Sequence, residues 1–309
     1  MTLTAWVVTD GKPGMENQCL GLAEALAAKT AVKRIAVAKP WRWLSPWPAL
    51  APLSAARPAL TPPWPDLLIA SGRQSIASSI RVRQAAAGRC FTVQIQDPVF
   101  RRGDFDLIVP PRHDGLRGAN VVSTRGALHR VTTARLAAEA ALWRGKLAHL
   151  PRPLVAVLIG GANGAFRLGA AEMTALAAGL RGLGAGLAVT PSRRTDPEAL
   201  AALRQGLAGA PAAIWDLQGD NPYFGYLGLA DYVVVTCDSV SMTSEALATG
   251  KPVFVVELPG GSRKFRAFHD GLMADGLTRR FQGRLEHWTY VPPDDTALVA
   301  AEIRRRLGL

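Results

Sequence analysis

The chain has 309 residues, and this length predicts two domains of about 150 residues each. Its three scattered cysteines match neither a disulfide framework nor a zinc cluster, so we expect a reducing compartment and no bound metal. The formal net charge of +12 favours an anionic partner, but no zinc-finger spacing or aromatic–basic RNA motif accompanies it, so nucleic acid is not an expected partner.

Short apolar segments alternate with Ala- and Leu-rich segments along the whole chain. The first apolar segment, 6–8, is not preceded by the basic and apolar regions of a secretory signal. No stretch approaches the about 18 consecutive apolar residues of a membrane-spanning helix, so we expect a cytoplasmic protein. Most apolar segments are apolar on both faces, which is typical of strands buried between helix layers, and their alternation with helices predicts parallel sheets. The expected strands are 6–8, 32–37, 67–70, 91–95, 107–109, 154–159, 187–189, 212–215, 232–235 and 253–256. The expected helices are 18–28, 75–87, 133–147, 170–180, 197–207, 240–249, 263–274 and 295–307.

A domain boundary is expected after residue 148. A polar, proline-containing stretch at 144–153 is followed by a new strand and a glycine-rich turn, which repeat the start of the chain. We therefore expect two Rossmann-like α/β domains, 1–148 and 149–309, that face a central cleft. The closing helix, 295–307, could pack on either of them.

Segment 39–66 interrupts this alternation, with eight of the 22 prolines and four of the eight tryptophans. Proline at this density opposes regular structure. In one interpretation the tryptophans contact lipid headgroups or a hydrophobic acceptor beside several cationic residues; in the other they pack over the edge of the sheet. The tryptophans are Trp41, Trp43, Trp47 and Trp64, and the cations are Lys39, Arg42 and Arg57.

Three strand ends in the N-terminal half are rich in polar residues. Asp10 is a candidate general base, because deprotonating an attacking hydroxyl requires one, and Asp97 is the alternative base. His113 and Asp114 also follow a strand and are minor candidates, whereas the other histidines are dispersed. Each of these residues also fits an ordinary turn or helix cap, and the functional interpretation depends on the strand ends meeting at one sheet edge. The expected acceptor-side residues are Gly11, Lys12, Gly14, Asn17, Gln18, Ser71, Gly72, Arg73, Gln74 and Gln96.

A glycine-rich turn follows the expected strand 154–159. Glycine lets the backbone approach a diphosphate with no Cβ in the way. The turn lacks the G-x-G-x-x-G spacing of a dinucleotide site and the Lys and Ser/Thr of a P-loop. Its position still favours a ligand, because ligands of open α/β sheets bind beyond the carboxyl ends of the strands. The turn residues expected to bind the diphosphate are Gly160, Gly161, Asn163 and Gly164.

Two further strand ends in the C-terminal half carry candidates. Arg193 and Arg194 could clamp phosphate oxygens bidentately; the alternative is a solvated pair, with Asp196 capping the next helix. In the following loop, Tyr223 or Phe224 could flank a nucleobase, or either ring could belong to the core.

The most informative segment is 238–252. A strand end followed by small hydroxyl residues places backbone N–H groups and the positive end of a helix dipole at the mouth of the sheet, where phosphate binds readily. Glu245 could accept hydrogen bonds from ribose hydroxyls. The alternative is that Asp238 or Ser239 only caps the helix and that Glu245 is a solvated helix residue. The expected nucleotide-binding residues are Asp238, Ser239, Ser241, Met242, Thr243 and Glu245.

Several of these motifs resemble those of known protein families. Residues 244–252 resemble the nucleotide-sugar signature of GT-B glycosyltransferases, which implies a ribose contact for Glu245. The turn at 160–164 is similar to the diphosphate loop of the lipid-linked N-acetylglucosaminyl transferases of peptidoglycan synthesis. Nearly the whole chain resembles the bacterial branch of the mitochondrial-fission, or elongated-mitochondria, family. The matching segments are 10–18, 71–75, 96–98, 159–166, 192–195, 221–231 and 237–252.

The resemblance implies a GT-B-like fold and a glycosyltransferase activity. We expect inverting transfer from a nucleotide-diphosphate sugar, with uridine as the base, to a hydroxyl of a lipid-linked or envelope glycan, with no cofactor. Asp238 and Glu245 are seven positions apart, whereas the paired glutamates of many retaining enzymes are eight apart, and the first glycine turn lacks the histidine of the peptidoglycan enzymes. The alternatives are a non-catalytic adaptor and a sugar-nucleotide epimerase. Positive charge would attract the protein to the anionic inner membrane.

Overall fold

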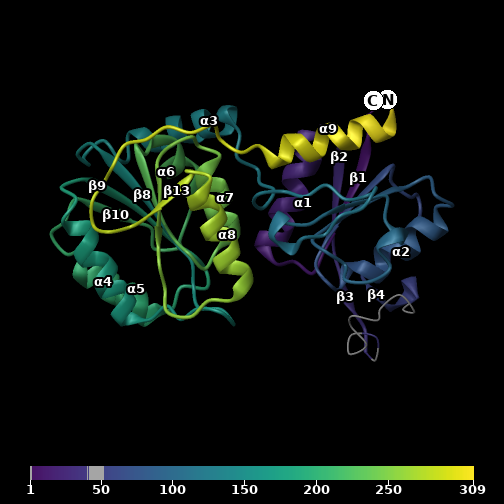
Figure 1. Ribbon diagram of the computed structural model, residues 1–309, viewed down its shortest axis with the longest axis horizontal. Coiled ribbons are helices and arrows are strands. Elements are labelled where there is room, and N and C mark those ends of the chain that lie inside the picture. The colour runs from purple at the N-terminus through teal and green to yellow at the C-terminus, as the bar shows by residue number, and fades with distance from the viewer. Residues whose placement is uncertain (1, 40, 42–51) are drawn as a thin grey trace. The chain divides into compact units, whose positions relative to one another are not determined.

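The computed structural model describes residues 2–39, 41 and 52–309, and the chain forms two compact units. Unit 1 consists of Met1–Arg130 and Asp294–Leu309, and unit 2 consists of Val131–Pro293. Each unit contains a parallel sheet with helices packed against it (Figure 1). Within the described ranges, no helix is long and apolar enough to cross a membrane.

The sheet of unit 1 has the strand order β2-β1-β5-β6-β7, and every pair in it is parallel. Counted along the sheet, this is the 2-1-3-4-5 order of a doubly wound fold, whose switch point lies between β1 and β5. The strands are β1 Thr4–Thr9, β2 Lys29–Arg34, β5 Leu67–Ser71, β6 Phe91–Ile95 and β7 Leu107–Val109, with a separate two-stranded pair, β3 Ala36–Val37 and β4 Ala56–Arg57. The helices are α1 Pro13–Ala25, α2 Ser75–Ala85 and α9 Asp295–Leu307.

Side-chain alternation along β1 separates two cores in unit 1. Val7 packs with Leu22 of α1 and Ile303 of α9, whereas Val8 points to the other face and packs with Val82 of α2. The C-terminal helix therefore completes the N-terminal unit, and it lies against α1 (Figure 1).

The observed first helix and second strand begin at earlier residues than the sequence predicted. β2 spans Lys29–Arg34 rather than 32–37, because it is an edge strand whose polar first residues carry no apolar signal. α1 begins at Pro13 rather than at residue 18, because the fixed φ of proline suits the first turn of a helix. The predicted turn residues Gly14, Asn17 and Gln18 consequently lie in α1.

Part of segment 39–66 can be placed. Trp64 packs edge-on against Trp6 of β1, with ring centroids 5.8 Å apart, and Trp41 packs against a small core that includes Val37. The packing interpretation therefore holds for these two tryptophans. Arg42, Trp43 and Trp47 lie outside the described residues.

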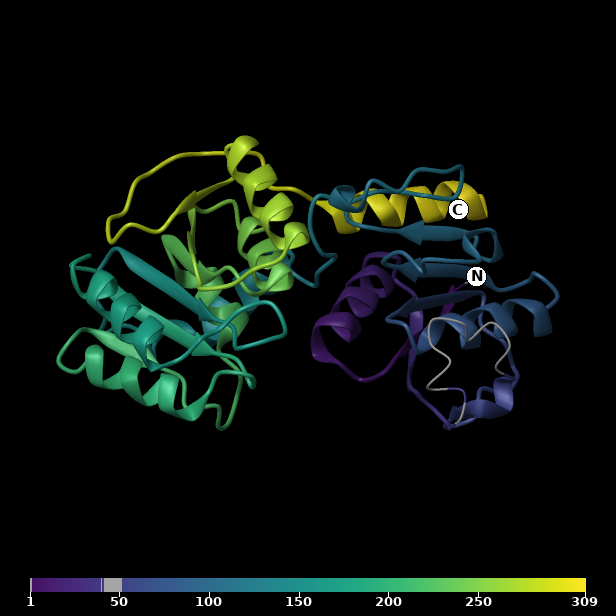
Figure 2. The ribbon, with the colours of Figure 1, turned by 60° about the horizontal axis from the view of Figure 1, so that its bottom comes forward.

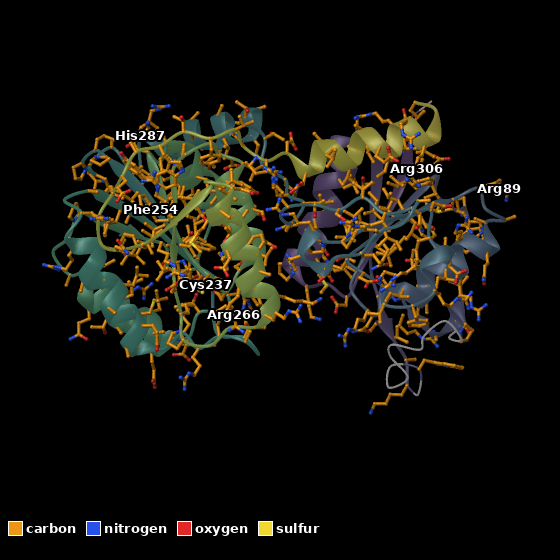
Figure 3. The ribbon with its side chains drawn as sticks, in the orientation of Figure 1. Arg89, Cys237, Phe254, Arg266, His287 and Arg306 are labelled. Carbon is orange, nitrogen blue, oxygen red and sulfur yellow. The ribbon has the colours of Figure 1, made fainter. Side chains whose placement is uncertain are left out.

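The sheet of unit 2 has the strand order β10-β9-β8-β11-β12-β13, also entirely parallel. This is the 3-2-1-4-5-6 order of the dinucleotide-binding fold, whose switch point lies between β8 and β11. The core surrounds this sheet. For example, Phe254 of β12, labelled in Figure 3, packs edge-on against Trp288, with ring centroids 5.1 Å apart. The strands are β8 Leu154–Ile159, β9 Gly186–Pro191, β10 Ala212–Ile214, β11 Tyr232–Thr236, β12 Val253–Val256 and β13 Thr278–Arg280. The helices are α3 Thr133–Arg144, α4 Ala170–Arg181, α5 Pro197–Gly206, α6 Tyr223–Leu229, α7 Val240–Leu247 and α8 Arg263–Ala274.

Helix α3 belongs to unit 2, because it packs closely along α6. A Cβ on Gly225 would lie 2.2 Å from Cδ1 of Trp143, and a Cβ on Gly228 would lie 2.5 Å from the carbonyl oxygen of Leu136. Two glycines on α6 thus allow the two helices to approach. The unit boundary therefore precedes α3, whereas we expected it after residue 148.

Helix α6 was expected as a loop. Its seven residues contain two glycines and no polar face, so the sequence gives no amphipathic signal, and the helix is stabilised by its burial against α3. Helices α4 and α5 lie side by side (Figures 1 and 2). Right-handed crossovers place α6, α7 and α8 on the opposite face of the sheet. The side chains at the start of α6 can therefore contact those of α7.

Lys251, just after α7, anchors the other end of α6. Its Nζ donates to the carbonyl oxygens of Leu227 and, at 2.9 Å, Gly228. Burial lowers the pKa of Lys251 to about 8, from an ordinary value of 10.5. Between these two values the unfolded chain holds more protons at this position than the folded chain, so Lys251 makes the free energy of unfolding rise with pH.

Replacing Lys251 with methionine should remove this rise. Chemical denaturation between pH 7.5 and 10.5 would measure it, with the exposed Lys29→Met as control. If the free energy of unfolding of Lys251→Met rises with pH as much as that of the wild type, other groups cause the rise.

Candidate functional site

The glycine turn after β8 lies against two neighbouring loops. A Cβ on Gly160 would lie 2.0 Å from Oδ2 of Asp238, and a Cβ on Gly161 would lie 2.2 Å from the carbonyl oxygen of Arg194. A Cβ on Gly164, in contrast, would meet nothing within 4 Å. At the first two positions, protein atoms therefore occupy the space in which we expected a ligand to approach. These glycines allow three strand ends to close on one another.

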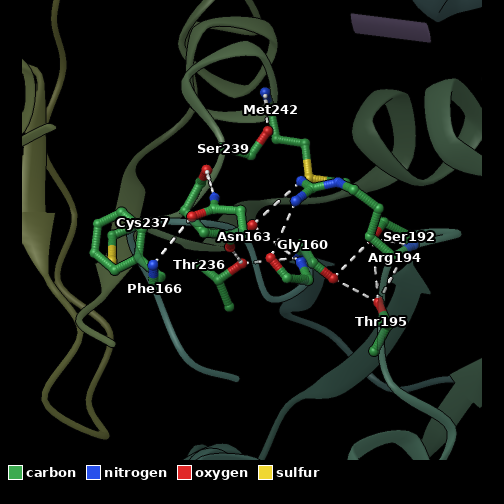
Figure 4. A network of polar contacts seen from close by, with 12 residues as sticks. Gly160, Asn163, Phe166, Ser192, Arg194, Thr195, Thr236, Cys237, Ser239 and Met242 are labelled. Atoms are coloured by element: carbon green, nitrogen blue, oxygen red, sulfur yellow. Dashed lines mark hydrogen bonds and ion pairs between the residues drawn. The ribbon is translucent and has the colours of Figure 1, made fainter. Parts of the chain in front are cut away.

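Asp238, just after β11, joins these strand ends through hydrogen bonds. Figure 4 shows the surrounding network, in which Gly160, Arg194 and Thr236 are labelled. Its side chain is fully buried. Oδ1 accepts a hydrogen bond from the Thr236 hydroxyl at 2.7 Å, and Oδ2 accepts one from the Gly161 amide at 2.9 Å. Thr236 in turn accepts from the Gly160 amide at 2.8 Å. Asp238 thus holds the glycine turn from inside the protein.

The loop after β9 closes the other side of the turn. The hydroxyls of Ser192 and Thr195 donate to the Gly160 carbonyl at 2.7 and 2.5 Å. Arg194 donates to the Gly161 carbonyl at 3.1 Å and reaches Asp238 at 3.4 Å. Its side chain is 49% exposed, and a guanidinium has five N–H donors, so donors remain for a ligand.

The predicted arginine pair is therefore divided. Arg194 is held at the glycine turn, whereas Arg193 is exposed. Asp196 accepts hydrogen bonds from the amides of Glu198 and Ala199 and so caps α5. This is the capping role that the alternative interpretation of the segment predicted.

Helix α7 starts beside the same turn. Ser239 caps it, since its Oγ accepts from the Met242 amide at 3.3 Å. Ser241 and Met242 in the first turn are half-buried, and the buried Thr243 donates to the Ser239 carbonyl. Asn163 donates to the carbonyl of Asp238 at 3.3 Å, which ties the glycine turn to this helix. The positive end of the α7 dipole therefore lies beside the turn.

Glu245 is a buried residue of α7, with 7% exposure, rather than a solvated one. Its Oε2 accepts a hydrogen bond of 2.5 Å from the hydroxyl of Tyr223 at the start of α6. Burial, and then the charge of Glu245, raises the pKa of Tyr223 well above its usual value of 10, so the tyrosine stays protonated and donates. The neighbouring Phe224 packs edge-on against Tyr223 and lies under Arg135, with 4.8 Å from the guanidinium carbon to the ring centroid.

We call the convergence of Gly160, Gly161, Arg194, Asp238 and Ser239 the carboxyl-edge site. It lies at the ends of β8, β9 and β11, next to the switch point of the sheet. A helix N-terminus and a guanidinium group meet there, and both are features that bind phosphate groups in α/β proteins.

Sequence reasoning missed residues that support this site. His269 of α8 is buried, and its Nε2–H donates at 2.8 Å to the carbonyl of Cys237, the residue before Asp238 (Figure 3). Burial lowers the pKa of His269, so the ring is neutral and braces the strand end. Thr236, a polar residue at the end of a buried apolar strand, gave a usable signal. His269 gave none, because its partner is distant in the sequence.

In unit 1, the turn after β1 lies at the switch point of that sheet. Asp10 accepts from Lys12 Nζ at 2.7 Å, but the lysine side chain is 67% exposed, so this pair is weak. Gly11 and Gly72 have φ of +82° and +94°, which only glycine adopts readily, and a Cβ on Gly72 would lie 2.9 Å from Sδ of Met15. The turn after β5 therefore lies against the first turn of α1.

Two of the other acceptor-side residues have structural partners, and two do not take part in such contacts within the described ranges. Gln74 accepts from the Val37 amide at 3.2 Å, and Gln18 donates to the Gly14 carbonyl at 3.2 Å. The hydroxyl of Ser71 is buried without a hydrogen-bond partner among the described residues, and Arg73 is exposed.

Asp97 is more tightly engaged than Asp10. Arg102 donates to both of its carboxylate oxygens, at 2.9 and 2.7 Å, and the amide of Val99 donates to one of them at 2.8 Å. The preceding Gln96 has a φ of +75°. This ion pair shapes the loop after β6.

His113 and Asp114 lie in a short 3-10 turn after β7. In the part of the chain that the structure describes, no group of three His, Cys, Asp or Glu side chains could hold a metal ion.

Two doubly wound units in succession, with phosphate-type loops at the carboxyl edge of the second, define a protein of the GT-B-like class. Comparison with known proteins then identifies the group to which it is related. The chain belongs to the mitochondrial fission ELM1 family, whose model matches residues 13–307. The Mitochondrial fission protein ELM1 of Arabidopsis thaliana is 30% identical, over 98% of this chain and 91% of that protein.

Solved structures support the same fold. The UDP-GlcNAc 2-epimerase of Methanocaldococcus jannaschii, in complex with UDP-GlcNAc and UDP, gives a TM-score of 0.55 with 10% identity over 100% of this chain and 99% of that one. A UDP-glucosyltransferase from Polygonum tinctorium gives a TM-score of 0.51 with 12% identity over 100% and 89%. At these identities the likeness concerns the fold. The expected GT-B-like α/β class is confirmed.

Proposed function

We propose that unit 2 binds a nucleotide-diphosphate sugar, with uridine as the base, at the carboxyl-edge site. The observation that carries this proposal is the hydrogen-bonded closure of the loops after β8, β9 and β11 around one helix N-terminus, with Arg194 held beside it. The positive end of the α7 dipole and the Arg194 guanidinium group would stabilise the negative charge of the departing diphosphate without a metal. The solved relatives named above support the choice of a uridine nucleotide, because one contains UDP and the other is a UDP-glucosyltransferase.

The proposed reaction is transfer of the sugar, with inversion, to a hydroxyl of a lipid-linked or envelope glycan. The acceptor oxygen forms a bond to the anomeric carbon while the bond to the diphosphate breaks, and the acceptor proton passes to a carboxylate. Asp10 is the proposed base, because its ion pair with Lys12 is exposed and can open. Glu245 would accept hydrogen bonds from the ribose.

Nucleotide binding gives the direct test. A ligand that binds only the folded state stabilises it by about 2.7 kcal/mol at 100 times its dissociation constant, so UDP at millimolar concentration should raise the melting temperature. Glu245→Ala should abolish this rise, whereas Glu198→Ala, at an exposed position of α5 in the same unit, should retain it. If no nucleotide sugar shifts the wild-type melting temperature, the proposal fails.

A second candidate function is favoured by the similarity to the Mitochondrial fission protein ELM1 of Arabidopsis thaliana. In this alternative the chain is a non-catalytic adaptor that retains the fold and recruits partners at a membrane surface, with segment 39–66 as the contact. Flotation with anionic liposomes, with and without this segment, combined with the nucleotide screen, separates the two functions. Lipid binding without nucleotide binding would favour the adaptor, and sugar conversion without any acceptor would indicate an epimerase.

A further inference from the structure

Helix α8 begins beside the glycine turn of the carboxyl-edge site. Two residues before its first turn, the amide of Gly261 donates to the carbonyl of Ala165 at 2.6 Å. Within the first turn, the ring of Phe265 packs edge-on against Phe166, with ring centroids 4.9 Å apart. The start of α8 is therefore joined to the same turn whose first residues contact Asp238.

The same helix passes the end of β11. One turn beyond Phe265, His269 donates to the carbonyl of Cys237, the residue before Asp238. Phe265 and His269 are four positions apart, so they lie on one face of α8, and this face packs against the carboxyl-edge site. Arg266 directly follows Phe265, at the margin of this face; Figure 3 labels Arg266 and Cys237. A long arginine side chain at this position can extend along the helix to the mouth of the site.

The first turn of α8 carries three cations and no acid. The cations are Arg263, Lys264 and Arg266, and all three are exposed. Among the described residues, neither Arg263 nor Arg266 forms an ion pair, although Asp270 is four positions after Arg266. Cations are unfavourable at the N-terminal end of a helix, because the dipole is positive there. This turn therefore lowers the stability of the free protein unless an anion compensates its charge.

The carboxyl-edge site itself supplies little net charge. Its guanidinium group, that of Arg194, lies 3.4 Å from the buried carboxylate of Asp238, so the two charges offset each other. The amides of Gly160 and Gly161 are already engaged, by Thr236 and Asp238. Both phosphates of a nucleotide diphosphate are anionic and bind best to charged donors. A diphosphate bound there requires further positive charge, and the start of α8 provides it.

We propose that Arg263 and Arg266 bind the diphosphate group of the donor and supply the positive charge that Arg194 lacks. This inference rests on the proposed nucleotide site and adds two binding residues to it. The bound anion also compensates the repulsion between these arginines and the helix dipole. Replacing them should therefore affect the free protein and the complex in opposite directions.

Titration calorimetry with UDP measures the contact. Arg263→Gln and Arg266→Gln should each weaken UDP binding by about tenfold, because each removes a charge-assisted hydrogen bond to phosphate. Both positions are exposed, so the variants should fold. Arg204→Gln, at an exposed position of α5 in the same unit, removes the same charge and should keep the wild-type affinity within about twofold.

The free protein gives an independent measurement. Arg263→Glu places a carboxylate in the first turn of α8, so the melting temperature without ligand should rise by about 2 °C. Its affinity for UDP should nevertheless be lower than that of Arg263→Gln, because the new charge repels the diphosphate. A melting temperature below that of the wild type would show that Arg263 has a structural role and would overturn its assignment as a binding residue.

Inorganic pyrophosphate separates this inference from the proposed function. At millimolar concentration it should raise the melting temperature of the wild type, and a variant with both Arg263→Gln and Arg266→Gln should lose this rise. If UDP and pyrophosphate bind the wild type and this variant equally, the nucleotide site stands and the inference is overturned. If pyrophosphate binds through the arginines but no nucleotide binds, the proposed function fails and the anion contact stands. If neither ligand binds the wild type, both fail.

Discussion

Asp238→Ala should destabilise unit 2 by about 3 kcal/mol, because it leaves two buried donors, the Gly161 amide and the Thr236 hydroxyl, without their acceptor. Arg194 loses its carboxylate partner in the same step. Urea denaturation followed by circular dichroism would measure the loss. Because the glycine turn is then no longer fixed, we also expect the variant to lose any UDP-dependent rise in melting temperature.

Two further variants make this result specific. Asp238→Asn keeps the size of the side chain and one acceptor oxygen, so its cost should be smaller than that of alanine. Asp220→Ala, at an exposed position of the same unit, should cost less than about 0.5 kcal/mol, as surface substitutions usually do. Equal stability of Asp238→Ala and Asp220→Ala would contradict the bracing role of Asp238.

Gly160→Ala should cost about 1–3 kcal/mol, the usual range for inserting an atom into a well-packed interior. The new methyl group would lie 2.0 Å from Oδ2 of Asp238, whose buried side chain has no free direction in which to move. The strand ends of β8 and β11 must then separate, which breaks the hydrogen bond from the Gly161 amide. Thermal unfolding and UDP titration of the same preparation would measure both consequences.

Gly164→Ala is the matched control. It lies in the same turn, but its added methyl group meets no atom within 4 Å, so stability should stay near that of the wild type. A comparable loss in both variants would mean that the turn requires backbone flexibility rather than close packing. The contrast therefore tests the physical reason for the glycines.

Buried elements could be predicted well from the sequence. The expected bounds 91–95, 107–109, 154–159 and 253–256 are those of β6, β7, β8 and β12, and 263–274 is that of α8. Apart from β6, which carries Thr92 and Gln94, these strands are apolar on both faces because helices cover both sides of a parallel sheet. Strand β2 and helix α6 could not be predicted in this way, since five of the six residues of β2 are exposed and α6 is stabilised by α3.

The candidate site was predictable by position but not by role. Strand ends and glycine turns located Gly160, Arg194 and Asp238, because ligand sites of such sheets lie at the carboxyl edge. That Asp238 faces the glycine turn rather than solvent depends on the pairing of β8 with β11, two strands far apart in the sequence. The partnership of Tyr223 with Glu245 depends likewise on a helix that the sequence did not predict.

The assembly of unit 1 from both chain ends affects the order in which the protein can mature during synthesis. Val299 and Ile303 of α9 fill the core beside β1 and α1, yet they are synthesised after the whole of unit 2. Unit 2 is continuous, so it can fold while the earlier half still lacks its final helix and leaves an apolar face uncovered. Synthesis of α9 is thus the step that completes the core of the N-terminal unit, and removal of residues 295–309 would destabilise the unit that is most distant from them in the sequence.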